Sequence, residues 1–331
     1  MKQHPKFAVI GGGSWATAIA KMLCVNLPEI AWYMRNEEAI SHMKAHHHNP
    51  NYLSSVEFNI NKLKLTSDIN EAIAYADYIV FAIPSAFLGG ELEKMTVSLK
   101  DKVIFSAIKG IVPETSLIVG EHFHDTYDLD YDNIGVITGP CHAEEVALER
   151  LSYLTIACGD AVKAGIVAEC LSGNYIKAKT SDDIIGTEYA AMLKNIYAIA
   201  AGIAHGLGYG DNFQSVLMSN GIREMKKFIK KVHKMKRNIN DSAYLGDLLV
   251  TGYSVFSRNR MFGNMIGKGY TVKSAMLEMS MVAEGYYAAK SAYELNQHHG
   301  AKTPIIDAVH DILYEGKDAR KVFKKLTDKL D

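Results

Sequence analysis

A glycine-rich segment near the N-terminus constrains the fold of this chain more than any other feature. Residues 11–16 read Gly-Gly-Gly-Ser-Trp-Ala, a G-x-G-x-x-A pattern between the apolar run Phe7–Ile10 and a stretch of helical spacing. In such a unit Gly11 permits the tight turn, Gly13 lets the backbone approach a pyrophosphate, and Ala16 allows close packing of helix on strand. The helix that follows would present unpaired N–H groups to the phosphates. We therefore expect a dinucleotide-binding fold to begin at this strand.

The first half of the sequence alternates short apolar runs with stretches of helical spacing, which is typical of a doubly wound parallel sheet. The run 78–83 is almost continuously apolar, as expected for a strand buried on both faces. After residue 181 the strand signals fade, and stretches such as 187–204 and 280–297 show helical spacing. We predict an α/β Rossmann domain over residues 1–181 and an all-α domain over residues 182–331. Further strands are expected at residues 30–34, 103–108, 134–137, 153–157 and 175–179.

The charge balance argues against a general nucleic-acid binder, which would carry an excess of basic residues. The 331 residues include 36 Lys and Arg and 37 Asp and Glu, a formal net charge of −1. No apolar run approaches the roughly 20 residues that a membrane-spanning helix needs, and the chain starts without a signal-peptide pattern. We therefore expect a protein that neither binds nucleic acid nor inserts into a membrane.

The cysteines and histidines give no indication of a metal site. The 4 cysteines show neither a C-x-x-C pair nor zinc spacing, which favours a reducing compartment and hence the cytoplasm. Residues 46–48 are three consecutive histidines in a polar stretch. Consecutive imidazoles cannot all face one ion, so we interpret this stretch as a loop and expect no metal.

The residues after the second strand bear on the choice of nicotinamide cofactor. An NAD-selective site usually has an acid there, which bonds the ribose hydroxyls. Residues 33–36 read Tyr-Met-Arg-Asn, and the first acids follow only at Glu37 and Glu38. A guanidinium suits a 2′-phosphate and stacks on adenine, so Arg35 favours NADP, with a plain surface position as the alternative. We expect NADPH or NADH as cofactor, with a preference for NADPH.

Two lysines occur in apolar surroundings, where an ammonium is costly unless it is paired or functional. Lys109 ends an apolar run of strand type, and Lys194 with Asn195 interrupts the apolar helical stretch 189–199. Burial lowers the pKa of a lysine and suits it to acid/base chemistry, whereas a snorkelling lysine would have no such role. Residues 257–260, Ser-Arg-Asn-Arg, suit a phosphate, although such a cluster alone is more often a helix cap or a salt-bridge surface.

Taken together, these segments resemble the NAD(P)-dependent sn-glycerol-3-phosphate dehydrogenases of bacterial type. The resemblance reaches from the first strand to about residue 297, with the motifs in the family's order. The motifs are residues 11–18 (GGGSWATA), 109–110 (KG), 139–147 (GPCHAEEVA), 193–196 (LKNI), 246–249 (GDLL), 257–260 (SRNR) and 282–285 (VAEG).

The resemblance implies reduction of dihydroxyacetone phosphate to sn-glycerol 3-phosphate, a glycerophospholipid precursor, and a helical domain like that of 6-phosphogluconate dehydrogenase relatives. It implies Lys194 as the catalytic acid/base. The residues implied around the reacting carbon are Lys109, Asn195, Asp247 and Thr251. The implied substrate contacts are Lys109, Gly139, Cys141, Lys194, Asp247, Ser257, Arg258 and Asn259. The implied cofactor contacts are Gly11, Gly13, Ser14, Trp15, Arg35, Lys109, Ala143, Arg258, Val282 and Glu284.

The sequence departs from the family pattern at several positions. Cys141 and His142 replace a hydroxyl residue and an aromatic, and a thiol is a weak hydrogen-bond partner. Asn220 stands where family members often have arginine, and the sequence gives no consequence for this change. The many Met and Tyr residues of the helical half suggest a homodimer.

Two other functions fit the two-domain pattern. A reductase of a hydroxy acid, an imine or ketopantoate would have the same plan, but the cluster at residues 257–260 favours a phosphorylated substrate. A dinucleotide-sensing regulator without catalytic activity would not need a buried lysine in each half of the chain. We therefore favour a mechanism in which Lys194 donates a proton to the developing alkoxide. Lys109 would stabilise the same charge, and Asp247 would orient the ammonium.

Overall fold

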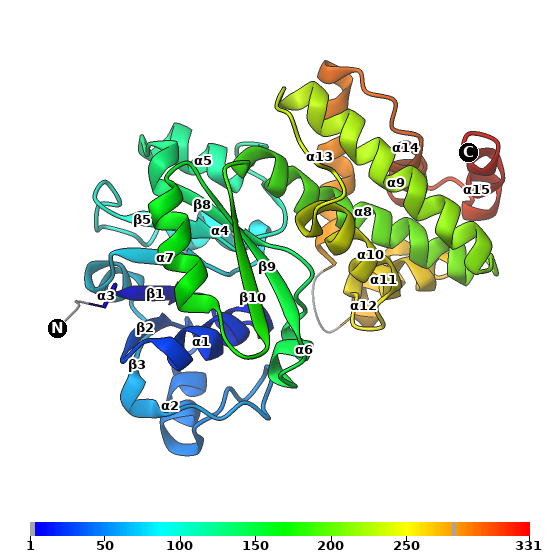
Figure 1. Ribbon diagram of the computed structural model, residues 1–331. Helices are drawn as coiled ribbons and strands as arrows, with labels where there is room; N and C mark the ends of the chain where they lie inside the picture. Colours follow the sequence, from blue (N-terminus) through cyan, green and yellow to red (C-terminus); the bar gives the residue numbers. More distant parts are fainter. Residues whose placement is uncertain (1–3, 280–282) are drawn as a thin grey trace. The chain divides into compact units, whose positions relative to one another are not determined.

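The computed structural model describes residues 4–279 and 283–331, which form two compact units (Figure 1). The first unit runs to Ile108 and continues over Val112–Ile185. The second unit comprises Lys109–Ile111 and Gly186–Asp331. The segment that contains Lys109 thus packs with the second unit, although its neighbours in sequence belong to the first.

The first unit is built on an eight-stranded sheet of order β10-β9-β8-β5-β4-β1-β2-β3. Neighbouring strands pair parallel, except for β8 and β9, which are antiparallel. The predicted Rossmann sheet is confirmed, and the antiparallel pair is an addition to it. The strands are β1 (Phe7–Ile10), β2 (Ile30–Tyr33), β3 (Leu63–Thr66), β4 (Tyr78–Phe81), β5 (Val103–Ser106), β8 (Ile134–Thr138), β9 (Ser152–Cys158) and β10 (Ile176–Ser181), with a separate pair β6 (Ile111–Val112) and β7 (Leu117–Ile118).

Helices cover both faces of this sheet, because alternate residues of a buried strand point to opposite sides. In β1, Phe7 and Val9 join one apolar cluster, whereas Ala8 and Ile10 join another. Residues of α1 and α7 complete the first cluster, and residues of α3 and α5 complete the second. The helices are α1 (Ser14–Asn26), α2 (Glu37–His46), α3 (Ile69–Tyr75), α4 (Leu88–Leu92), α5 (Val119–Tyr127), α6 (Ala143–Ala147) and α7 (Ala161–Leu171), with short turns η1 (Ile60–Lys62), η2 (Ser85–Phe87) and η3 (Tyr131–Asn133).

The edge strand β3 escaped the sequence prediction, and its burial explains why. Only Leu63 of its four residues is buried, and Lys64 is exposed. An edge strand has a neighbour on one side only, so it does not show the continuous apolar run of the central strands.

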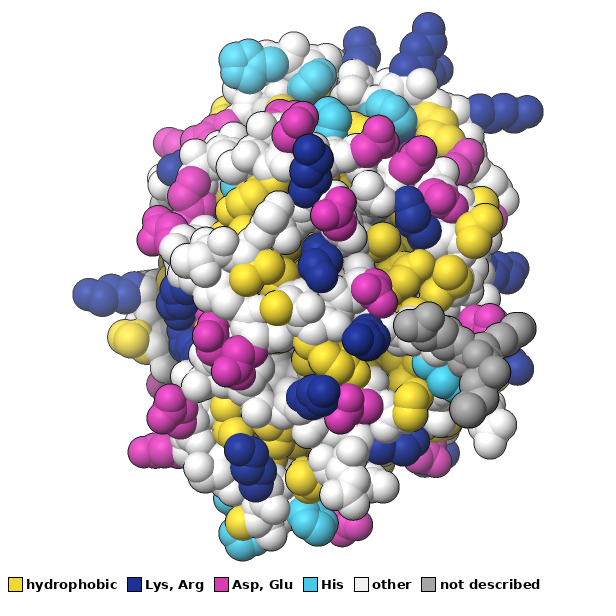
Figure 2. Space-filling model, turned by 90° about the vertical axis from the view of Figure 1, so that its left-hand side faces the viewer, with side chains coloured by type: hydrophobic (Ala, Val, Ile, Leu, Met, Phe, Trp, Pro, Cys, Tyr) yellow, Lys and Arg dark blue, Asp and Glu magenta, His cyan; other side chains and the backbone are white. Residues whose placement is uncertain are grey.

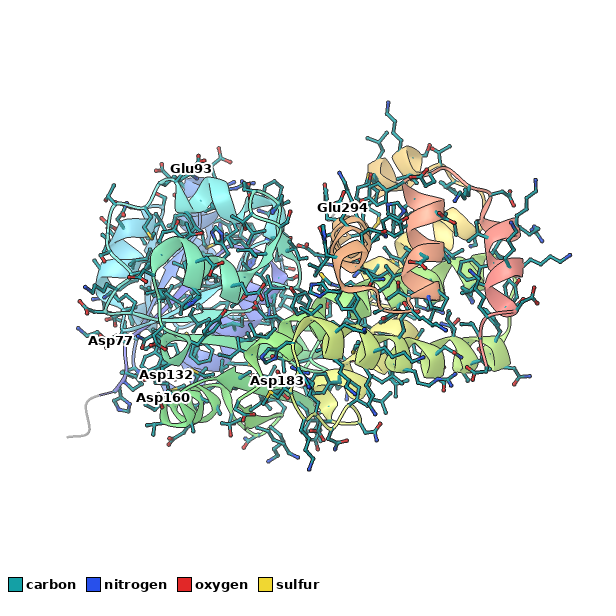
Figure 3. All side chains as sticks on the ribbon, turned by 90° about the horizontal axis from the view of Figure 1, so that it is seen from above. Asp77, Glu93, Asp132, Asp160, Asp183 and Glu294 are labelled. Carbon is teal, nitrogen blue, oxygen red and sulfur yellow. The ribbon has the colours of Figure 1, made fainter. Side chains whose placement is uncertain are left out.

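Side-chain caps fix the turn that leads into α7. Asp160 accepts hydrogen bonds from the backbone N–H groups of Val162 and Lys163 at 2.8 and 3.1 Å. The Lys163 ammonium donates to the Asp132 carbonyl at 3.0 Å, and Asp132 and Asp160 lie near one another in Figure 3.

Acidic and basic side chains alternate over the face in Figure 2, as expected from the balanced composition.

The second unit is helical, and α8 is its central element. Every residue from Gly186 to Ala204 is buried, so this helix has no solvent face along most of its length. No described helix is long and apolar enough to cross a membrane. The helices are α8 (Ile184–Gly206), α9 (Asp211–Val232), the π-helical turn η4 (Ser242–Gly246), α10 (Asp247–Tyr253), α11 (Arg258–Gly267), α12 (Val272–Glu278), α13 (Glu284–His299), α14 (Pro304–Leu313) and α15 (Ala319–Thr327).

Glycines allow α8 and α11 to approach with their backbones nearly in contact. A Cβ atom placed on Gly263 would lie 2.1 Å from the Ile199 carbonyl oxygen, and one on Gly202 would lie 2.1 Å from that of Arg260. Real Cβ atoms do not approach backbone atoms so closely, so any larger residue would separate the two helices. This packing positions the first turn of α11 against α8.

We expect Gly263→Ala to lower the free energy of unfolding by about 1–3 kcal/mol, because an extra methyl group in a close-packed core forces backbone shifts. Urea-induced unfolding followed by circular dichroism measures the change. Gly165→Ala in α7 is the control, since a Cβ there meets nothing within 4 Å. That variant should be as stable as the parent or more stable by up to about 1 kcal/mol. Equal stability of both variants would contradict the close approach of α8 and α11.

Candidate functional site

The glycine-rich turn connects β1 to α1 with the geometry of a phosphate-binding turn. Gly11 has a φ of +134°, and a Cβ on it would lie 2.4 Å from the Ala82 carbonyl oxygen. Only glycine fits this position. A Cβ on Gly13 would meet nothing within 4 Å, so the turn is open on that side.

The N-terminus of α1 is available to an anion. Gly13 precedes the helix at Ser14 without a side-chain cap, and the first turn contains no acidic residue. The N–H groups at the start of a helix and its dipole favour a phosphate there. These features fit the pyrophosphate of a dinucleotide.

The other predicted cofactor residues lie in different parts of the chain. Arg35 is exposed after β2, and its guanidinium carbon lies 5.8 Å from the centre of the Phe87 ring. Trp15 lies in the first turn of α1, and the buried Ala143 begins α6. Glu284 begins α13 in the second unit, whereas Val282 lies outside the described residues.

Lys194 lies in the middle of α8 with its side chain only 3% exposed. Its ammonium forms an ion pair with Asp247, which is 1% exposed and begins α10 directly after the π-helical turn η4. The ammonium lies inside the unit and not at its surface, so a snorkelling lysine is excluded. Of the lysines and arginines in the described part of the chain, only Lys194 is buried.

Burial lowers the pKa of Lys194 from its ordinary value of 10.5 to about 7. The Asp247 carboxylate opposes this effect, and the nearby Lys109 ammonium adds to it. A lysine with such a pKa exchanges its proton near neutral pH, as a general acid or base requires.

Two polar side chains fix the surroundings of the Lys194–Asp247 pair. Asn195 donates from Nδ2 to the Lys109 carbonyl at 3.1 Å and so ties the segment Lys109–Ile111 to α8. Thr251 donates from Oγ1 to the Asp247 carbonyl at 2.6 Å, one turn along α10. The second unit therefore brings together Lys194 and the four residues predicted around the reacting carbon.

The predicted phosphate cluster forms the start of α11. Ser257 caps the helix by accepting from the Arg260 N–H at 3.3 Å, and Arg258 is its first residue. The buried Asn259 accepts from the Gly285 N–H at 2.8 Å through Oδ1. This bond sets the orientation of the amide and leaves its NH₂ group to donate to an anion. Both the helix-cap and the phosphate interpretations of residues 257–260 are thus compatible with this geometry.

Gly139 and Cys141 belong to the first unit, in the segment after β8. Gly139 has a φ of +114°, and a Cβ there would lie 2.8 Å from the Tyr153 carbonyl oxygen. The Cys141 side chain is buried, and the residue is 2% exposed. No group of three His, Cys, Asp or Glu residues among those described is arranged to hold a metal ion.

Comparisons with known proteins match nearly the whole chain. The profile of the NAD-dependent glycerol-3-phosphate dehydrogenase N-terminus matches residues 6–164, and that of the C-terminus matches residues 183–324. Glycerol-3-phosphate dehydrogenase [NAD(P)+] of Macrococcus caseolyticus is 34% identical over 324 residues, covering 97% of both chains. The enzyme of the same name from Latilactobacillus sakei is 36% identical over 95% of this chain and 93% of its own. The crystal structure of glycerol-3-phosphate dehydrogenase from Coxiella burnetii matches with a TM-score of 0.89 and 27% identity, over 98% of this chain and 99% of that one.

The chain belongs to the NAD-dependent glycerol-3-phosphate dehydrogenase family. It is therefore an oxidoreductase that uses NAD(P). The resemblance seen in the sequence is confirmed over nearly the whole length of the chain. The roles of the individual residues remain predictions.

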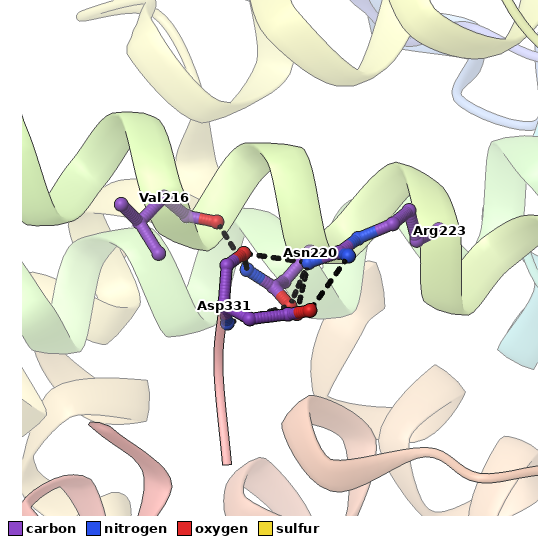
Figure 4. A network of polar contacts seen from close by, with 4 residues as sticks. All are labelled: Val216, Asn220, Arg223 and Asp331. Atoms are coloured by element: carbon purple, nitrogen blue, oxygen red, sulfur yellow. Dashed lines mark hydrogen bonds and ion pairs between the residues drawn. The ribbon is translucent and has the colours of Figure 1, made fainter. Parts of the chain in front are cut away.

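The structure explains one departure from the family pattern, Asn220 in α9 (Figure 4). Its Nδ2 donates to the Val216 carbonyl at 2.9 Å and to a main-chain oxygen of Asp331 at 2.8 Å. Arg223, one turn further along, donates to the Asn220 Oδ1 at 2.7 Å and pairs with the Asp331 carboxylate. Asn220 thus anchors residue 331 to α9 in this protein.

Sequence reasoning missed the side chains that support the glycine-rich turn, namely Thr17, Trp32 and Asn49. Asn49 follows the three histidines, in a stretch interpreted as a loop, and His46 in fact ends α2. The Asn49 side chain bonds the turn at Gly12, 37 residues away in sequence. No local pattern indicates a contact over such a separation.

The pKa of Lys194 predicts how stability depends on pH. Between about pH 7 and 10.5 the unfolded chain holds a proton on this lysine that the folded chain lacks. The contribution of Lys194 to the free energy of unfolding therefore falls by up to about 1.4 kcal/mol for each unit that the pH falls within this range. Below about pH 7 the contribution is constant.

We expect this slope to disappear in Lys194→Met/Asp247→Asn, which removes the lysine without leaving an unpaired buried carboxylate. Urea unfolding of parent and variant at several pH values between 7.5 and 10 measures the difference, in which other titrating groups cancel. Parallel stability curves would contradict a lowered pKa at Lys194.

Proposed function

We propose that this protein reduces dihydroxyacetone phosphate to sn-glycerol 3-phosphate with NADPH or NADH, and that Lys194 is the general acid/base. The observation that carries the proposal is the buried Lys194–Asp247 ion pair beside Lys109. A positioned ammonium with a pKa of about 7 can both give and accept a proton at physiological pH. The family's activity on glycerol 3-phosphate supports the choice of substrate.

The proton balance of the reaction follows from the chemistry of a ketone. When bound, the reduced nicotinamide supplies a hydride, which brings two electrons to the carbonyl carbon. The π electrons of the C=O bond move to the oxygen, which then takes a proton from the Lys194 Nζ. Lys194 becomes a neutral amine and regains its proton from solvent. In the reverse direction the neutral amine accepts the hydroxyl proton.

The neighbouring charges have separate tasks in this mechanism. Lys109 lowers the pKa of Lys194, and its own positive charge stabilises an oxyanion at the same place. Asp247 keeps the ammonium paired and oriented, and its carboxylate opposes the lowering of the pKa of Lys194 by burial. Asn195 holds the Lys109 segment beside α8.

The start of α11 would bind the substrate phosphate. Arg258 supplies a guanidinium, and Asn259 supplies an NH₂ group whose direction is set by the bond to Gly285. Charge-assisted hydrogen bonds of this kind hold the unreactive end of a substrate and fix its carbonyl for reaction. Gly139, Cys141 and Ser257 complete the proposed substrate contacts.

The proposed cofactor contacts are Gly11, Gly13, Ser14, Trp15, Arg35, Lys109, Ala143, Arg258 and Glu284. Arg35 supports a preference for NADPH, because its exposed guanidinium follows β2, where an acid would otherwise bond the ribose. We further propose that the protein acts in the cytoplasm and that its product, sn-glycerol 3-phosphate, is used in glycerophospholipid synthesis. Exposed apolar side chains such as Val255 and Leu277, which are 72% and 78% exposed, support a homodimer.

Lys194→Met tests the proposed acid, because it keeps the apolar stem and removes the ammonium. The kcat for reduction should fall by about 10²–10⁴, while the KM for NADPH changes little. In the parent, the kcat for reduction should fall as pH rises through about 7, and that for oxidation should rise. Steady-state kinetics in both directions measure these values, with the exposed Lys290→Met as control. A kcat within about threefold of the parent would remove Lys194 as the acid.

Arg35→Asp tests the cofactor preference. The new carboxylate would repel a 2′-phosphate and bond ribose hydroxyls, so the ratio of kcat/KM for NADPH to that for NADH should fall by at least about tenfold. The same ratio in Lys44→Asp, an exposed lysine in α2, should stay at the parent value. An unchanged ratio in Arg35→Asp would show that Arg35 does not contact the cofactor.

A further inference from the structure

Three consecutive carbonyl groups of the glycine-rich turn are each held by a buried side chain, and each side chain comes from a different part of the first unit. Trp32 lies in β2, Asn49 follows α2, and Thr17 lies in α1. All three are fully buried. The bonds are Trp32 Nε1 to Gly11 O at 2.7 Å, Asn49 Nδ2 to Gly12 O at 3.0 Å, and Thr17 Oγ1 to Gly13 O at 2.9 Å.

These bonds determine where the N–H groups of the turn point. A peptide group is planar, and in the trans form its C=O and N–H point in opposite directions. The described chain contains no cis peptide bond. Holding the carbonyls of Gly11, Gly12 and Gly13 therefore directs the N–H groups of Gly12, Gly13 and Ser14 away from the three side chains. No described residue accepts a hydrogen bond from any of these three N–H groups.

The hydrogen-bond directions leave Asn49 and Thr17 a single arrangement. The Thr17 hydroxyl gives its only proton to Gly13, so it must accept the bond from the Asn49 Nδ2 at 2.9 Å. The Asn49 Oδ1 accepts from the N–H groups of Asn51 and Tyr52 at 3.0 and 3.3 Å. Both ends of the Asn49 amide are thereby fixed, and its Nδ2 is directed at the Gly12 carbonyl.

We propose that Trp32, Asn49 and Thr17 are positioning residues for the cofactor pyrophosphate. They act through the backbone. Trp32 and Asn49 fix the peptide planes after Gly11 and Gly12, and the Thr17 hydroxyl reinforces the bond of 2.9 Å that its own backbone N–H makes to the Gly13 carbonyl. The three N–H groups are thus set to donate to the phosphate oxygens before the cofactor arrives. Without them the glycine turn, which has few steric limits, would have to be ordered at the moment of binding. The proposal rests on NAD(P) binding and is independent of the role of Lys194.

The test compares Trp32→Phe, Asn49→Ala and Thr17→Val, each of which removes one donor, with Thr17→Ser, which keeps the hydroxyl. Steady-state kinetics give kcat and the KM values for NADPH and dihydroxyacetone phosphate. Competition against NADPH gives inhibition constants for ADP-ribose, which has the pyrophosphate, and for adenosine, which lacks it. Thermal unfolding of each variant reports on the fold.

For the three donor-removing variants, we expect the KM for NADPH and the inhibition constant of ADP-ribose to rise about tenfold or more. The kcat, the KM for dihydroxyacetone phosphate and the inhibition constant of adenosine should stay within about twofold of the parent, and Thr17→Ser should behave like the parent. Such a pattern differs from that of a catalytic defect at Lys194, which lowers kcat and leaves the KM for NADPH unchanged.

Three results would overturn the proposal. The first is a KM for NADPH that stays at the parent value in the donor-removing variants. The second is an equal rise in the inhibition constants of ADP-ribose and adenosine, which would indicate that the whole domain is less ordered. The third is a defect in Thr17→Ser as large as that in Thr17→Val. Because valine and threonine have nearly the same shape, the Thr17 pair decides the question if either of the other variants fails to fold.

Discussion

The buried ion pair of Lys194 and Asp247 is the interaction on which the second unit depends. An ammonium in the middle of a fully buried helix costs several kcal/mol of desolvation, and breaking such a pair would leave the other charge unpaired. The fold therefore has to bring α10 against α8 at this point. The same burial that makes the pair costly also lowers the pKa of Lys194 to about 7. Stability is thus lost in exchange for the pKa that the proposed acid/base role requires.

The same unit accommodates a second buried ionisable side chain in a different way. Glu224 of α9 accepts from the N–H groups of Ile305 and Ile306, at 2.9 and 3.0 Å, and so caps α14. Burial raises its pKa to about 8, although both backbone donors favour the carboxylate. The Glu224 side chain uses both of its oxygens to cap the start of α14, which is a structural role. Lys194 is instead paired with the single carboxylate of Asp247 and lies beside the Lys109 ammonium.

The sequence predicted the parts of this protein whose causes are local. The central strands appear as apolar runs because both of their faces are covered, and the glycine turn appears because a left-handed backbone admits few other residues. Lys194 was found because a charge in an apolar helix contradicts its surroundings. The half-polar edge strand β3 and the antiparallel pair of β8 and β9 were missed. Both depend on which strands become neighbours, and periodicity carries no information on that.

The support of the glycine turn shows why part of a functional site stays invisible in a sequence. A G-x-G-x-x-A pattern records the residues that must be small, but not the donors that hold their carbonyls. Trp32 looks like any aromatic residue of a strand, and Asn49 looks like a loop residue before a proline. Each receives its task from a contact with the turn that only the folded chain provides. The motif therefore specifies where a dinucleotide can approach, whereas distant side chains determine how well the backbone is prepared to bind it.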